Sequence, residues 1–125
     1  NTIKSKLSTE ISDYWKIHYM FERVGKKQNP GLTNNFIDLI IINVYVPYVF
    51  AIGTLEDNEN YKSIAVNWLN NIKPEQNSIL KKWKEILVIN KSAFDSQALL
   101  EQKNEFCSKN LCLHCRIGQI LLKRL

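Results

Sequence analysis

The feature that most constrains this chain is a long apolar run in its first half. The run extends from Phe36 to Ile52 and is interrupted by Asp38, Asn43 and Pro47. Its Ile and Val content favours a β-strand, and periodicity alone does not separate a buried strand from a buried helix. The run is longer than an ordinary strand, and this length favours a helix. We therefore predict a buried helix over residues 36–52, with a strand as the alternative.

Local signals predict where this helix begins, ends and bends. Thr33 or Asn34 can cap its N-terminus, and Gly53 lies just beyond its predicted C-terminal end. Pro47 has no backbone N–H and its ring clashes with the preceding turn, so we expect it to kink or split the helix. A membrane span needs about 20 predominantly apolar residues, which the interrupted run does not supply. We expect a core element and no membrane partner.

Apolar residues recur at spacings of three and four in several other segments, which is the pattern of amphipathic helices. A polar loop with Gly and Pro, residues 25–31, follows the first of them. Ser8 or Thr9 can cap that first helix, and Asp95 or Ser96 can cap a later one. The predicted helices cover residues 8–24, 58–72, 74 or 77 to 87, 95–106 and 111–122.

Composition supports one helical domain. The chain has 125 residues, of which 45% are hydrophobic, and this is enough to bury a core without disulfides. Four Gly and three Pro are few for a loop-rich or sandwich protein. We predict an all-α fold, a compact bundle of about six helices over residues 1–125, with a Pro-kinked buried central helix and a short Cys-bearing C-terminal helix-turn-helix. The chain begins at Asn1 and has no secretory signal pattern, so we expect a fragment of a larger cytoplasmic protein.

Three cysteines are crowded into a short segment near the C-terminus: Cys107, Cys112 and Cys115. A two-residue gap lets two thiolates reach one metal ion from a single turn, and the third can arrive across a short loop. Zinc needs four ligands and an iron–sulfur cluster usually takes four cysteines, so the fourth would be His114, His18, Asp95 or a residue outside this chain. The simpler interpretation is reduced thiols that pack as small hydrophobic side chains. We expect no cofactor, with a zinc or iron–sulfur site as the alternative, and leave a redox role open.

The other charged and titratable residues predict no active site. The net charge is +5, and Lys81, Lys82 and Lys84 lie on one predicted helix. Such lysines could contact nucleic-acid phosphates, although interspersed Glu residues are typical of a solvated helix face. His18 lies among apolar residues, where a histidine is usually a hydrogen-bonded structural residue. The chain shows no nucleophile–base pair, Gly-rich phosphate loop or paired carboxylates, so we expect no enzymatic activity in it.

Several stretches carry a resemblance to a known family: YWKIHY (14–19), INVYVP (42–47) with residues 50–51, DSQAL (95–99), KNEFC (103–107) and CLHCRIG (112–118). Together they resemble the C-terminal part of a bacterial family, domain-of-unknown-function family 2851. The resemblance implies a longer N-terminal region with carboxylate-bearing motifs similar to those of metal-dependent nucleases. The tail is also similar to the cluster loop of helix-hairpin-helix DNA glycosylases, but its spacing differs and the fourth cysteine is missing.

These observations favour a helical structural or interaction module. It would pack on the N-terminal domain of its own protein or on a protein partner. The alternative is a nucleic-acid-binding accessory domain of a nuclease-like protein, with phosphate contacts from Lys81, Lys82 and Lys84 and a metal-stapled cysteine tail. Phosphate binding weakens as salt rises, and this dependence discriminates the two functions.

Overall fold

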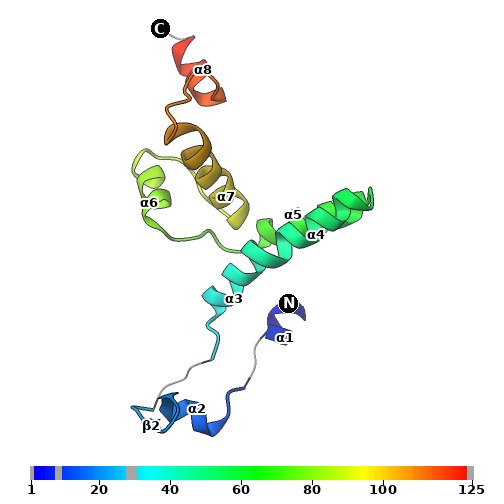
Figure 1. Cartoon of the computed structure of the whole chain (residues 1–125). Coiled ribbons are helices and arrows are strands. Elements are labelled where there is room, and N and C mark those ends of the chain that lie inside the picture. Colours follow the sequence, from blue (N-terminus) through cyan, green and yellow to red (C-terminus); the bar gives the residue numbers. More distant parts are fainter. Residues whose placement is uncertain (1, 8–9, 28–30, 124–125) are drawn as a thin grey trace. The chain divides into compact units, whose positions relative to one another are not determined.

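The computed structural model describes residues 2–7, 10–27 and 31–123, and the fold of these residues is helical apart from one short hairpin (Figure 1). The all-α prediction is therefore confirmed. Contacts between residues divide the chain into two units, residues 1–47 and 48–125, and each unit is described by itself below. The prediction of a single domain over residues 1–125 stays a prediction.

The first unit consists of short elements that precede a long helix. Helix α1 lies against α3, and the Lys4 ammonium forms an ion pair with the Asp38 carboxylate. The loop predicted over residues 25–31 is confirmed for those of its residues that are described. In chain order the elements are α1 (Thr2–Leu7), α2 (Asp13–Ile17), β1 (His18–Met20), β2 (Arg23–Val24) and α3 (Asn34–Ile40).

The helix predicted over residues 8–24 is confirmed only for Asp13–Ile17, because residues 10–12 are not helical and the chain leaves the helix after Ile17. His18 leaves the helix with extended backbone (φ −124°, ψ 130°), and its strand pairs antiparallel with β2. Within the described residues, α1 is a separate short helix that the periodicity did not predict. The proposed caps Ser8 and Thr9 lie outside the described residues.

Aromatic contacts within the hairpin explain the difference. The Tyr14 hydroxyl accepts a hydrogen bond from Glu22 N–H (3.1 Å) in the turn between the strands. Trp15 and Phe21 pack edge to face, with ring centroids 5.1 Å apart. Aromatic residues at helical spacing therefore meet across a chain reversal, which spacing alone does not distinguish from one face of a helix.

The long apolar run is helical from Asn34 to Leu55, which confirms the helix and excludes the strand alternative. Thr33 caps it, because its Oγ1 accepts a hydrogen bond from Phe36 N–H (3.2 Å). The turn before Pro47 is a π-helix, η1 (Ile41–Tyr45), and α4 (Val46–Leu55) follows it. Proline cannot donate to the fourth carbonyl before it, and a widened turn accommodates that loss without ending the helix.

Gly53 was predicted to lie beyond this helix, and that prediction is wrong, because the helix continues to Leu55. A Cβ atom at Gly53 would come within 3.0 Å of Asn58 O and Lys62 N. The glycine therefore permits a close approach of α4 to the start of the next helix rather than terminating α4.

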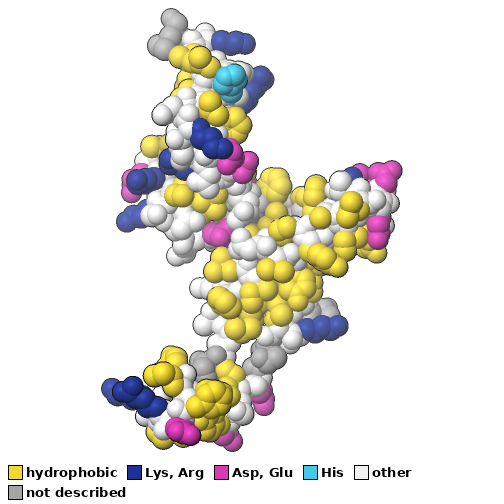
Figure 2. Space-filling view, viewed as in Figure 1, with side chains coloured by type: hydrophobic (Ala, Val, Ile, Leu, Met, Phe, Trp, Pro, Cys, Tyr) yellow, Lys and Arg dark blue, Asp and Glu magenta, His cyan; other side chains and the backbone are white. Residues whose placement is uncertain are grey.

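The prediction that this helix is buried is only partly right. Ile37, Ile41 and Ile42 are buried, yet only 28% of the most apolar stretch of the helix is covered. Hydrophobic side chains gather along α3 and α4 in Figure 2. With 22 residues, the helix from Asn34 to Leu55 is long and apolar enough to cross a membrane, a property that the core helices of soluble proteins share. The described residues leave much of its apolar surface uncovered.

In the second unit, α7 packs against both α5 and α6. Each of these helices has an N-cap side chain that accepts a backbone N–H: Asn58, Asn77 and Ser92. The elements are α5 (Glu59–Asn71), α6 (Ser78–Glu85), α7 (Ala93–Glu101), the π-helix η2 (Gln102–Cys107) and α8 (Arg116–Leu122). The helices predicted over residues 58–72 and from Asn77 are confirmed at their starts.

Other predicted helix ends differ from the structure. Helix α6 ends at Glu85, because Leu87 takes a left-handed backbone conformation (φ 62°) and is exposed instead of buried. Helix α7 begins two residues before Asp95, since Ser92 Oγ accepts from Asp95 N–H (3.4 Å). The last helix begins at Arg116 and not near Leu111, because residues 111–115 form turns.

Ser96 was predicted as a possible cap and instead forms the polar centre of the second unit. Its side chain is 0% exposed. Its hydroxyl accepts a hydrogen bond from Glu75 N–H (3.0 Å) and lies within donating distance of Asn90 Oδ1 (3.0 Å) and Ser92 O (3.1 Å). One buried hydroxyl thus ties the segment before α6 and the segment after it to α7.

We expect Ser96→Ala to lower the free energy of unfolding by about 1–3 kcal/mol, because Glu75 N–H loses its partner in a buried setting. Urea unfolding followed by circular dichroism measures the change. Ser63→Ala, at an exposed position of α5, is the matched control and should change stability by less than about 0.5 kcal/mol. Equal effects of the two substitutions would show that the hydroxyl network is not a stabilising centre.

Candidate functional site

The cysteine tail is built from two helix ends and the turns between them. Cys107 is the last residue of η2, and Ser108 N–H donates to Lys103 O (2.8 Å) across the wide π-helical turn. Asn110 takes a left-handed conformation (φ 54°) in the turn that follows η2. Cys115 N–H then donates to Cys112 O (3.3 Å), and Cys115 occupies the N-cap position of α8.

Gly118 lets α8 lie directly on the preceding turn. A Cβ atom at this position would overlap the carbonyl oxygen of Cys112. The clash would involve backbone atoms, which cannot move aside as a flexible side chain can. Gly118 is therefore a packing requirement of the turn that carries Cys112 and Cys115.

The structure brings two of the three thiols to one side chain. Gln102 Nε2 donates a hydrogen bond to Cys115 Sγ (2.9 Å) and lies 4.0 Å from Cys107 Sγ. Cys115 is 5% exposed, whereas Cys107 and Cys112 are both exposed. All three cysteines are free thiols. One buried thiol, Cys115, and one exposed thiol, Cys107, therefore lie near the same amide nitrogen.

Hydrogen bonds to its sulfur lower the pKa of the Cys115 thiol below its ordinary value. The largest cause is the backbone N–H of Gly118, and the Gln102 amide and Ile117 N–H act in the same direction. Burial opposes them, because desolvation disfavours the charged thiolate. The N–H groups that α8 leaves without helical partners at its first turn thus favour the thiolate form of Cys115.

The predicted metal ligands are only partly brought together. Within residues 2–7, 10–27 and 31–123, no group of three His, Cys, Asp or Glu side chains is arranged to hold a metal ion. Cys107 and Cys115 meet at Gln102, while Cys112 and His114 are exposed on the turn. The metal site at Cys107, Cys112 and Cys115 stays a prediction, as does the expectation of no cofactor.

His18 lies in the hairpin of the first unit. Its ring stacks on Tyr14 with centroids 3.9 Å apart, and its Nδ1 donates a hydrogen bond to Tyr14 O (2.7 Å). This is the hydrogen-bonded structural histidine that the sequence predicts.

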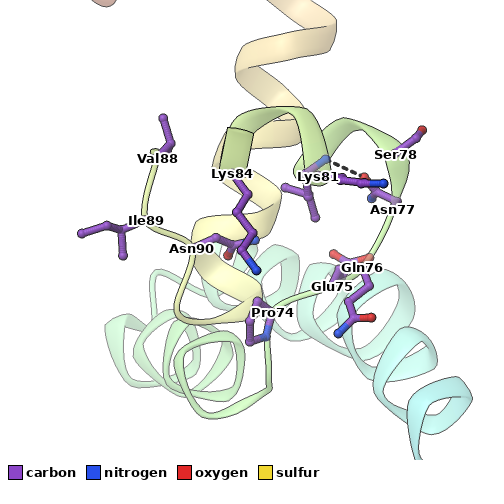
Figure 3. A pocket seen from close by; sticks show the side chains of 11 residues that line it. Pro74, Glu75, Gln76, Asn77, Ser78, Lys81, Lys84, Val88, Ile89 and Asn90 are labelled. Atoms are coloured by element: carbon purple, nitrogen blue, oxygen red, sulfur yellow. Dashed lines mark hydrogen bonds between the residues drawn. The ribbon is translucent and has the colours of Figure 1, made fainter. Parts of the chain in front are cut away.

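The three α6 lysines are exposed and are divided between two hollows. Lys81 and Lys84 line an open cleft of about 680 Å³, where the Lys84 side chain extends beside Asn90 (Figure 3). Lys82 lines a second hollow together with Lys103 and Cys107. Two of the three lysines therefore line one cleft, and nucleic-acid contact at Lys81, Lys82 and Lys84 stays a prediction.

Sequence reasoning missed Gln102 and Gly118. Gln102 lies within the helix predicted over residues 95–106. Its separation of five residues from Cys107 aligns the two side chains in a π-helical turn and not in an α-helical one. Gly118 carried a signal, since a glycine inside an apolar helical segment often marks a close backbone approach.

We expect Gln102→Leu to raise the pKa of the Cys115 thiol, because the substitution removes a donor that stabilises the thiolate and adds apolar surface. At any pH near the pKa, the variant should hold a smaller fraction of thiolate than the wild-type chain. The ¹³Cβ chemical shift of Cys115 followed across pH measures the pKa directly. Gln76→Leu, an exposed glutamine away from the thiols, should leave the pKa unchanged; the same shift in both variants would exclude a role for the Gln102 amide.

Comparison with known proteins gives one match. The model of the family described as "Protein of unknown function (DUF2851)" matches residues 1–78. The match includes the stretches 14–19 and 42–51, and the stretches 95–99 and 103–118 lie beyond it. No curated protein and no solved structure matches the chain. Because the match covers more than half of the residues, the chain belongs to the DUF2851 family of proteins of unknown function.

Proposed function

We propose that this chain is a helical interaction module, the C-terminal part of a larger bacterial member of its family. It packs through an apolar helix on the N-terminal domain of its own protein or on a protein partner. The single observation that carries the proposal is the helix from Asn34 to Leu55, which is long and apolar and only 28% buried over its most apolar stretch.

The C-terminal half of that helix presents a regular apolar face. Tyr48, Ala51 and Leu55 recur at three- and four-residue spacing in α4, and all three are exposed. The exposed fraction is 63% for Tyr48 and 85% for Leu55. A contiguous exposed apolar face is costly in water and is typical of surfaces that another protein element covers.

A covering protein element accounts for this face better than chemistry within the chain. The cysteine turn, residues 107–115, holds the three thiols of the chain. Its hydrogen bonds and the close contact at Gly118 stabilise the turn itself. We therefore propose that the chain has no enzymatic activity of its own, needs no cofactor to fold, and works in the cytoplasm. Any activity of the whole protein would then arise in its other parts.

We expect Tyr48→Glu combined with Leu55→Glu to destabilise the full-length protein while leaving the isolated chain almost unchanged. Two carboxylates buried without partners in an interface cost several kcal/mol, whereas the same groups exposed to water cost little. Thermal unfolding of both forms, with and without the substitutions, measures the difference.

Asn60→Glu combined with Asn70→Glu, at two exposed positions of α5, is the matched control and should affect neither form. Carbene footprinting gives a second readout, in which Tyr48 and Leu55 should be labelled less in the full-length protein than in the isolated chain. Equal labelling in both would show that no other part of the protein covers this face.

A second candidate function is nucleic-acid contact by α6. The observation in its favour is that, among the described residues, the ammonium groups of Lys81, Lys82 and Lys84 form no ion pair. They are therefore available to phosphates. In this function the chain would be an accessory domain beside a nuclease-like region of the same protein, with a metal-stapled cysteine tail.

For this second function, we expect Lys81→Ala combined with Lys84→Ala to weaken duplex DNA binding at low salt. The slope of log K against log salt should fall by about one unit for each phosphate that the variant no longer neutralises. Fluorescence anisotropy between about 50 and 200 mM salt measures the slope. Lys26→Ala combined with Lys27→Ala, two exposed lysines of the first unit, serves as the charge-matched control. Absence of wild-type binding at the lowest salt would exclude nucleic-acid contact.

A further inference from the structure

Cys107 and Cys115 form a pair that neither the family match nor the proposed docking face explains. Both sulfurs lie near the same atom, Gln102 Nε2, at 4.0 Å and 2.9 Å. The distance between the two sulfur atoms therefore cannot exceed the sum of these two N–S distances. Seven residues separate the two cysteines in sequence, so it is the fold of the turn that brings them together.

The two thiols differ in how solvent reaches them. Cys107 is exposed and lines an open hollow of about 320 Å³ with Lys82 and Lys103, so a small oxidant reaches its sulfur directly. Cys115 is buried against Gln102. One thiol is therefore placed to be oxidised first, and the other is held close by and shielded.

The backbone around both cysteines can adjust to bring the sulfurs into bonding distance. Cys107 ends η2 and is followed by the turn at Asn110, while Cys115 precedes the first residue of α8. Helix ends and turns rearrange at lower cost than helix interiors do. Formation of the disulfide also breaks the hydrogen bond that Gln102 Nε2 donates to Cys115 Sγ.

We infer that Cys107 and Cys115 are a reversible redox pair, oxidised by hydrogen peroxide to a disulfide that ties the end of η2 to the start of α8. In the first step the peroxide O–O bond breaks, one oxygen is transferred to Cys107 Sγ as a sulfenic acid, and water leaves. In the second step Cys115 Sγ attacks Cys107 Sγ, the S–O bond breaks, and the hydroxide leaves with the Cys115 proton as water. The two thiols together lose two electrons, which the peroxide gains.

Peptide mapping tests the pair, because trypsin separates the two cysteines. Cleavage after Lys103, Lys109 and Arg116 places Cys107 on one peptide and both Cys112 and Cys115 on the next. The full-length protein is treated with one equivalent of hydrogen peroxide, and the linked peptides are identified by mass spectrometry. We expect a Cys107–Cys115 link that dithiothreitol reverses.

Two exposed-site variants distinguish this pair from the other thiol combinations. Cys112→Ser is the matched control and should form the link at a rate within about twofold of the wild type, whereas Cys107→Ser should slow loss of the Cys115 thiol by about tenfold or more. Both positions are exposed, so folding of the variants can be confirmed by circular dichroism. A dominant link to Cys112, loss of the link in Cys112→Ser, or oxidation of Cys107 to the sulfinic acid without any disulfide would overturn the inference.

Discussion

The buried hydroxyl of Ser96 is the interaction on which the second unit depends. The connection from α5 to α6 and the connection from α6 to α7 both meet at this oxygen, through Glu75 N–H and Asn90 Oδ1. Burial without these partners would be costly, so the network specifies one arrangement of the two connections. Trp83 adds a further tie to α7, because its Nε1 donates to Leu99 O (3.2 Å). Since η2 continues directly from α7, the position of the cysteine turn rests on the same centre.

Local signals predicted the elements that local chemistry determines. Thr33 was expected as a possible helix cap and serves as one, and Asn77, expected as a possible start of a helix, caps that helix. A side chain that accepts an N–H in the first turn needs only its neighbours in sequence. The all-α class followed from the spacing of apolar residues and the scarcity of glycine and proline. Where side chains at helical spacing meet across a reversal, as Tyr14 and Phe21 do, periodicity predicts the wrong element.

The candidate site was predicted in outline and not in its geometry. The cysteine spacing marked the segment, but the pairing of Cys107 with Cys115 depends on Gln102, whose position follows from a π-helical turn that no sequence pattern predicts. The burial of the long helix was overestimated for a different reason. An apolar sequence shows that a surface must be covered, and does not show whether the cover belongs to the same segment of chain.

In the π-helical turn of η2, the alignment of Gln102 with Cys107 depends on the number of residues between them. In an α-helix a residue five positions on is rotated by about 140° from the first, so Cys107 would face away from Gln102. A π-helix has more residues per turn, so the rotation between Gln102 and Cys107 is close to one full turn. Cys107 therefore lies on the same side of the helix as Gln102. Deletion of one residue between them would restore the same alignment in an ordinary α-helical turn, and insertion of one would break it in either geometry. Among relatives, the length of this segment therefore carries as much information as the identity of its residues.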